Sequence, residues 1–238
     1  MTPDPAAETL LLFDVDGTLV TGASTEHAQA LRSALCDVHG ITAAQAAAPV
    51  GPAGRTDGEI ARLILLDAGV SAQRIDERAS EVRAAVCERY AAACPTDLSA
   101  RVIPGIPELL DALAGRPGVR LSLVTGNYEP VCRLKLKRAG LGHHFPSGQG
   151  GFGSDSEDRS MLPAIARRRA GSGGIPFPRE RTIVIGDTPR DIACARADGV
   201  RCVAVATGPF PAQELGDADG VAGTARELAA ALEPLLGG

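Results

Sequence analysis

The sequence lacks the features that would mark a nucleic-acid-binding, membrane or exported protein. It has no long run of lysine and arginine and a net charge of −5, which argues against nucleic acid or an anionic membrane as a partner. No apolar stretch approaches the roughly 18 residues of a spanning helix, and residues 1–5 show no export signal. We therefore expect a cytoplasmic protein, monomer or homodimer, with small-molecule partners.

The chain also has no CxxC pair among its six cysteines. Most of the cysteines fall within apolar helix or strand patterns, which is typical of free, buried thiols and not of a zinc site or a disulfide framework. The 238 residues are 45% hydrophobic and 22% charged, as in ordinary globular proteins. This length is enough for one large domain, or for a core with a smaller inserted domain, without covalent cross-links.

A long helical stretch separates the first predicted strand from the rest of the chain. Residues 9–13 form a continuous apolar run that breaks into Asp, Gly and Thr, which indicates a short buried strand. About 80 residues of helical pattern follow. The pattern predicts three helices there, at residues 25–39, between Thr56 and Gly69, and at 73–92. We therefore predict a helical cap domain at residues 22–94, inserted into a core of residues 1–21 and 95–238.

Strands and helices alternate in the second part of the chain. Strands are predicted at residues 121–124, 182–185 and 202–205, and helices near Pro107, at 130–139, at 190–197 and after Thr224. This alternation predicts an α/β fold with a Rossmann-like parallel sheet. Residues 146–160 are rich in Gly, Ser and Asp, so we interpret them as a loop without a chemical role.

Polar residues follow three of the predicted strands. Asp14 and Asp16 follow the first, the triplet Thr-Gly-Asn at residues 125–127 follows the second, and Asp187 with Asp191 follows a later one. Each group alone is also compatible with a turn or a helix cap. Because the carboxyl ends of parallel strands share one edge of a sheet, where ligands bind, we expect the three groups to converge there.

These residues resemble the motifs of the haloacid dehalogenase superfamily, in particular its phosphoglycolate-phosphatase-like members with a small helical cap. The matching motifs are DVDGT at residues 14–18, the threonine Thr125, and GDTPRD at residues 186–191. Many members also carry a lysine before the fourth strand, where this sequence has none. Its two lysines are Lys135 and Lys137, and only one of them can face the site from a helix. We select Lys135, in a Lys-Leu pair ten residues beyond Thr125, as a subset of the family does.

The resemblance implies roles for the four aspartates. Asp14 would attack phosphorus and form an aspartyl-phosphate. Asp16 would protonate the leaving group and then accept a proton from water. Mg²⁺ would be held by Asp14, the main-chain carbonyl of Asp16 and Asp187, with Asp191 as a further acidic partner.

The remaining predicted site residues would hold the substrate. Thr125 and the backbone amides of Gly126 and Asn127 would bind phosphoryl oxygens, and Lys135 would add a positive charge, although a solvated helix lysine is the alternative. Arg55, beside the helix start at Thr56, is either a substrate contact from the cap or a surface side chain.

The motifs together predict a Mg²⁺-dependent phosphatase that acts on a small phosphorylated metabolite. A dehalogenase needs neither a metal nor an acid two residues after the nucleophile, so Asp16 argues against it. A phosphomutase of the β-phosphoglucomutase type shares both aspartates and the cap. A non-catalytic phospho-ligand-binding protein on the same fold is a third possibility, because fold does not fix function.

Overall fold

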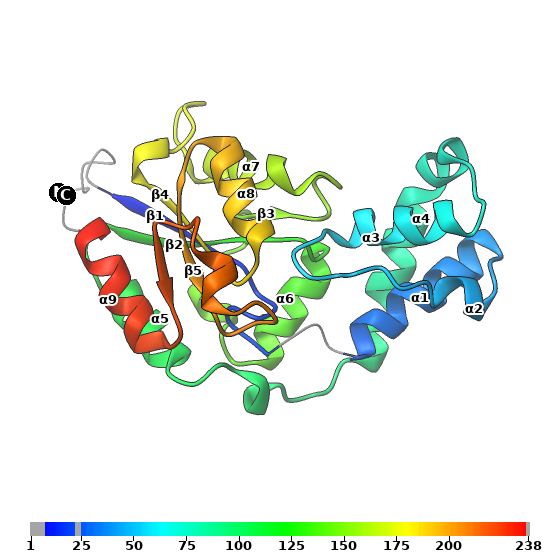
Figure 1. Ribbon diagram of the computed structural model, residues 1–238, viewed down its shortest axis with the longest axis horizontal. Helices are drawn as coiled ribbons and strands as arrows, with labels where there is room; N and C mark the ends of the chain where they lie inside the picture. The colour runs from blue at the N-terminus through cyan, green and yellow to red at the C-terminus, as the bar shows by residue number, and fades with distance from the viewer. Residues whose placement is uncertain (1–7, 22–24, 237–238) are drawn as a thin grey trace.

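The core is a six-stranded, fully parallel sheet in the order β3-β2-β1-β4-β5-β6 (Figure 1). The computed structural model describes residues 8–21 and 25–236. The strands are β1 (Thr9–Phe13), β2 (Val119–Thr125), β3 (Gly151–Phe152), β4 (Thr182–Gly186), β5 (Arg201–Val205) and β6 (Gly220–Ala222). This order is that of a doubly wound Rossmann-like fold, so the predicted fold class is confirmed.

Helices cover both faces of the sheet. Every residue of β1 is buried, because alternate side chains enter two separate hydrophobic cores. Leu11 and Phe13 pack with α5 (Ile106–Ala114), α6 (Glu129–Arg138) and α9 (Ala225–Leu236). Leu10 and Leu12 pack with α7 (Leu162–Ala170) and α8 (Pro189–Asp198) on the other face. The continuous apolar run at the start of the chain is therefore the signature of a central strand.

Four helices between β1 and β2 stand apart from the sheet, beyond the carboxyl ends of its strands (Figure 1). They are α1 (Thr25–His39), α2 (Ala43–Ala46), α3 (Asp57–Asp67) and α4 (Ala72–Ala93). Three of them match the predicted helices, whereas the single turn α2, capped by Thr42, is too short to leave a periodic pattern. The predicted boundary at residue 22 lies outside the described residues. The assignment of residues 22–94 to a cap domain stays a prediction.

The interpretation of residues 146–160 as a plain loop is wrong. The segment contains β3, which pairs with the end of β2, and the start of a 3₁₀ helix at Arg159–Met161. Within the described residues, four further 3₁₀ helices connect the elements, at Ser99–Arg101, Gly142–His144, Arg179–Arg181 and Ala212–Leu215. A two-residue strand has no hydrophobic period, so only its pairing partner reveals it.

All six cysteines are free thiols, four of them buried, as predicted. None of the helices within residues 8–21 and 25–236 has the length and apolar character to cross a membrane.

Candidate active site

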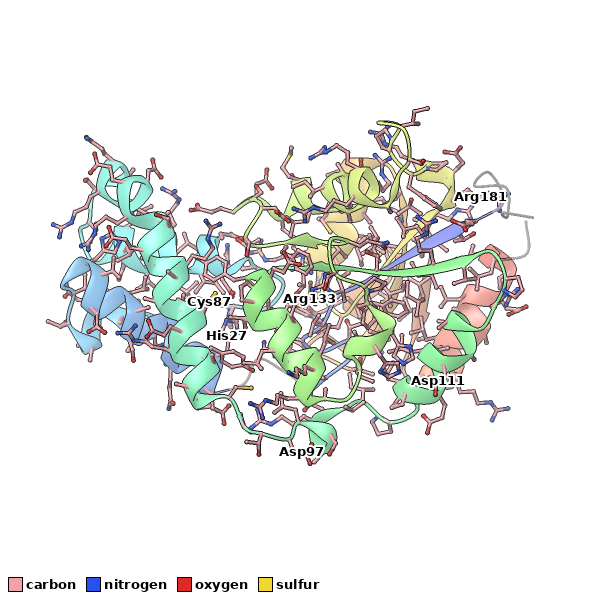
Figure 2. The ribbon with its side chains drawn as sticks, turned by 180° about the vertical axis from the view of Figure 1, so that it is seen from behind. His27, Cys87, Asp97, Asp111, Arg133 and Arg181 are labelled. Atoms are coloured by element: carbon pink, nitrogen blue, oxygen red, sulfur yellow. The ribbon has the colours of Figure 1, made fainter. Side chains whose placement is uncertain are left out.

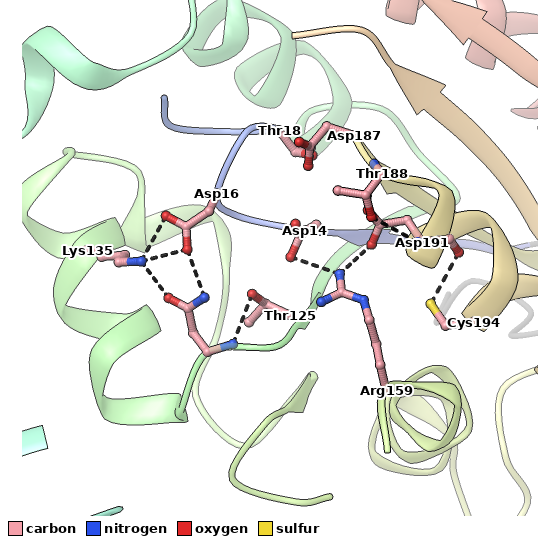
Figure 3. A network of polar contacts seen from close by, with 11 residues as sticks. Asp14, Asp16, Thr18, Thr125, Lys135, Arg159, Asp187, Thr188, Asp191 and Cys194 are labelled. Atoms are coloured by element: carbon pink, nitrogen blue, oxygen red, sulfur yellow. Dashed lines mark hydrogen bonds and ion pairs between the residues drawn. The ribbon is translucent and has the colours of Figure 1, made fainter. Parts of the chain in front are cut away.

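The polar groups that follow β1, β2 and β4 meet in one cavity. Asp14, Asp16, Asp187 and the segment 125–127 all line it, although Asp14 and Asp16 are more than 100 residues away from the others along the chain. Parallel strands carry their following loops to a common edge, which is why distant motifs converge here. Figure 3 shows the aspartates, Thr125 and Lys135 side by side at this edge.

Three buried carboxylates form one cluster in this site. Oxygens of Asp14, Asp187 and Asp191 lie within 4.8 Å of one another, and all three residues are buried. Asp191 is held by the start of α8, where its Oδ2 accepts hydrogen bonds from the Thr188 amide at 3.0 Å and the Thr188 hydroxyl at 2.7 Å. Carboxylate oxygens are the ligands that Mg²⁺ prefers. The cluster can therefore hold a divalent cation.

Two glycines, Gly17 and Gly208, pack so closely against the Asp187 carboxylate that neither position has room for a side chain. Gly17 has a positive φ of 86°, and a Cβ on it would lie 2.5 Å from Cγ of Asp187. A Cβ on Gly208, in the loop after β5, would lie 2.6 Å from the same atom. The hydroxyl of Thr18 donates a hydrogen bond to Oδ1 of Asp187 at 3.3 Å. Glycine is thus needed on two sides of the cluster.

Arg159, which was not predicted as a site residue, lies between Asp14 and Asp191. Its Nη2 is 3.2 Å from Oδ1 of Asp14 and also forms an ion pair with Asp191 (Figure 3). Only 7% of the residue is exposed. It comes from residues 146–160, to which we gave no chemical role, and it stands before β4, where many family members carry their lysine. An arginine in place of that lysine was the signal available in the sequence.

Burial and mutual repulsion disfavour the ionised forms of the clustered carboxylates. Burial raises the pKa of Asp14, Arg159 opposes that rise, and the charges of Asp191 and Asp16 add to it. Burial and the charges of Asp14 and Asp191 raise the pKa of Asp187 in the same way. A bound divalent cation would offset this repulsion and favour the ionised carboxylates.

Asp16 belongs to a second polar group, with Lys135 and Asn127. Nζ of Lys135 lies 2.8 Å and 2.6 Å from the two carboxylate oxygens of Asp16 and donates to Oδ1 of Asn127 at 2.7 Å. The amide of Asn127 donates to Asp16 at 2.8 Å. Burial alone would raise the pKa of Asp16, but the charges of Lys135 and His27 and these hydrogen bonds lower it. Lys137 is exposed, so Lys135 is the lysine at this site.

Two residues of the inserted helices extend this second group. Nδ1 of His27, on α1, lies 3.3 Å from Nζ of Lys135, and its Nε2 lies 3.2 Å from Oδ2 of Asp57, on α3. The same oxygen of Asp57 accepts a hydrogen bond from the Tyr128 amide at 2.7 Å. Figure 2 shows His27 where the inserted helices meet the core. Neither residue was predicted as part of the site, because no local motif surrounds them.

The loop before α3 contacts the backbone that follows β2. A Cβ on Gly126 would lie 2.9 Å from Cα of Thr56, and the amide of Asp57 donates to the carbonyl of Gly126 at 2.8 Å. Arg55 lines the cavity, but its guanidinium also binds Glu59 and the carbonyl of Gly51, the latter at 3.0 Å. Arg55 therefore lies near the site with its charge already paired.

Comparison with known proteins identifies the family. A family model described as haloacid dehalogenase-like hydrolase matches residues 11–196, and the chain belongs to this family of hydrolases. The phosphoglycolate phosphatase of Rhodospirillum rubrum is 32% identical over 206 residues, which are 83% of this chain and 79% of that protein. The predicted resemblance is thus confirmed.

Other relatives differ in size or are similar only in fold. The tyrosine-protein kinase PtkA of Mycobacterium tuberculosis is 29% identical over 202 residues, 84% of this chain but 62% of that protein. The structure of β-phosphoglucomutase from Clostridium difficile superposes with a TM-score of 0.64 at 16% identity, covering 96% of this chain and 97% of that one. At this identity the likeness concerns the fold alone.

Proposed function

We propose that the protein is a Mg²⁺-dependent phosphatase that hydrolyses a small phosphorylated metabolite through an aspartyl-phosphate. The observation that carries the proposal is the arrangement of Asp14 beside the buried carboxylates Asp187 and Asp191, with Asp16 two residues further along the chain. Arg159 pairs with Asp14, and Lys135 pairs with Asp16. Membership of a hydrolase family with a phosphatase among the relatives supports it. The six free cysteines support a location in the reducing cytoplasm.

In the first step, a carboxylate oxygen of Asp14 attacks phosphorus, and the bond from phosphorus to the leaving oxygen breaks. The barrier is mainly electrostatic, because an anionic nucleophile approaches an anionic phosphoryl group. Arg159 lies 3.2 Å from Asp14, where it can orient the nucleophile and neutralise charge on the transferring group. Thr125 and the amides of Gly126 and Asn127 line the same cavity and would bind phosphoryl oxygens.

Asp16 would move the proton in both steps. Lys135 favours its ionised form, which is the form that accepts a proton from the attacking water in the second step. A substrate phosphate would compete for Lys135 and bring negative charge near Asp16, which favours the protonated acid needed by the leaving group. Water then displaces Asp14 from phosphorus, and phosphate and free Asp14 result.

The carboxylates fit a magnesium ion. Asp14, Asp187 and the main-chain carbonyl of Asp16 would hold it, with Asp191 as an additional acidic partner, and all are hard oxygen donors. The ion would supply positive charge that offsets the repulsion between the carboxylates and the phosphoryl oxygens.

The direct test is phosphate release from an aryl phosphate, measured with Mg²⁺ and with EDTA. We expect wild-type turnover with Mg²⁺, none with EDTA, and none above background in Asp14→Asn. Asp67→Asn, an exposed position at the end of α3, is the matched control and should keep wild-type turnover. Release of free phosphate also distinguishes a hydrolase from a phosphomutase, which returns the phosphoryl group to its substrate. Equal rates in wild type and Asp14→Asn would overturn the proposal.

A further inference from the structure

The cavity at Asp14 continues well beyond the residues that would hold a phosphate. Its volume is about 560 Å³, and it extends between the core and the inserted helices. Helices α1 and α3 and the loop between α2 and α3 contribute six apolar side chains to its wall, namely Leu31, Ala48, Val50, Pro52, Ile60 and Ile64. From this wall we infer that the substrate is a phosphate monoester with a bulky, apolar leaving group. The inference rests on the proposed phosphatase function.

Two polar side chains near this wall, Arg55 and His27, already have partners within the protein. The guanidinium of Arg55 binds Glu59 and the carbonyl of Gly51. The ring of His27 lies between Asp57 and Lys135. Arg32 also lines the cavity, but it is exposed on α1 and can keep its charge in water. A leaving group with many hydroxyls would find few partners here, and burying unpaired hydroxyls costs free energy.

The size of the cavity leads to the same conclusion. Cavities of roughly 300–1,000 Å³ hold ligands much larger than a phosphate on a two-carbon acid. Such a small acid would leave most of the apolar wall uncovered. Val50 and Ile60 are only half-buried in the structure, so an apolar leaving group would remove further apolar surface from water. Alkyl or aryl groups therefore match this wall better than glycolate or a sugar.

A series of straight-chain alkyl phosphates from ethyl to hexyl tests the inference, because leaving-group reactivity stays nearly constant while apolar length grows. We expect kcat/KM to rise about threefold for each added methylene until the wall is covered. Phosphoglycolate and glucose 6-phosphate should be turned over less efficiently than hexyl phosphate. The matching alkylphosphonates, which cannot be hydrolysed, measure affinity separately by calorimetry and should bind more tightly in the same order.

Two substitutions on one helix localise the effect. Ile60→Thr puts a hydroxyl on the cavity wall and should lower the ratio of hexyl to ethyl kcat/KM. Leu63→Thr, on α3 but outside the cavity, should leave that ratio unchanged.

The outcomes separate the inference from the proposed function. If no phosphate ester is hydrolysed but phosphonate affinity still rises with length, the phosphatase proposal fails and the apolar ligand site stands. If phosphonate affinity is absent, flat or falling with length, the inference is overturned. The same holds if phosphoglycolate or glucose 6-phosphate is the better substrate.

Discussion

Nη2 of Arg159 lies 3.2 Å from Oδ1 of Asp14, so an arginine at the start of the 3₁₀ helix before α7 contacts the proposed nucleophile. Arg159→Met should lower kcat/KM by about 10²–10³-fold, the usual cost of removing one donor that stabilises charge in a transition state. Arg159→Lys should lose less of kcat/KM, because lysine keeps the positive charge although it lacks the planar guanidinium. Steady-state kinetics on an aryl phosphate would measure both.

Arg168→Met is the control for Arg159, since Arg168 is an exposed residue of α7. It should keep wild-type kinetics. Arg159→Met should also melt at a lower temperature, because Asp14 and Asp191 lose their buried cation. Wild-type turnover in Arg159→Met would restrict this arginine to a structural role.

Lys135 and Lys137 are two residues apart on α6 but lie in different environments. Lys135 is 2% exposed and contacts both oxygens of Asp16, whereas Lys137 is exposed. Lys135→Met should therefore reduce kcat by about 10²-fold or more, since the proposed acid loses its charged partner. Lys137→Met should stay within about twofold of wild type. If the two variants rank the other way round, the prediction of Lys135 from the sequence is wrong.

The sheet and the strand-end residues are predictable because both follow from chain-local patterns. The apolar run of residues 9–13 gives the central strand, and parallel topology then carries Asp14, Thr125 and Asp187 to one edge. The choice of Lys135 depends instead on the family resemblance, which implies a lysine ten residues beyond Thr125. These inferences need no knowledge of how the loops pack.

The contributions from loops and inserted helices are not predictable in this way. Arg159 follows a Gly- and Ser-rich segment without hydrophobic period. Because the family motif has a lysine at this place, a search for lysine does not find the arginine that contacts Asp14 and Asp191. His27 and Asp57 lie on amphipathic helices whose polar residues normally face water. Only the packing of the inserted helices against the core, with α4 beside α6, brings His27 to Lys135 and Asp57 to His27.

His27 and Asp57 are expected to act through Lys135 as positioning residues. The Asp57–His27–Lys135 chain holds the ammonium group against Asp16, so His27→Gln should reduce kcat by about tenfold or more with little change in KM. Asp57→Asn should have a similar effect. A double-mutant cycle on kcat should be non-additive, because both residues act through one lysine.

The control for this chain is His143→Gln, an exposed histidine after α6, which should leave kcat unchanged. A merely structural role for His27 and Asp57 would lower the melting temperature of both variants while kcat per folded molecule stayed at the wild-type value. Additive losses in the cycle would separate the two residues and contradict a shared path through Lys135.

Magnesium should stabilise the folded protein through the cluster of Asp14, Asp187 and Asp191. A ligand that binds only the native state raises the free energy of unfolding by about 2.7 kcal/mol at 100 times its Kd, so the melting temperature should increase with Mg²⁺. Asp187→Asn removes one of the three carboxylates and should lose most of that increase. Asp217→Asn, at an exposed position that is not part of the cluster, should keep the increase in melting temperature. Calorimetry in MgCl₂ against NaCl of equal ionic strength separates binding from screening. An equal increase in Asp187→Asn and in wild type would show that the ion binds elsewhere.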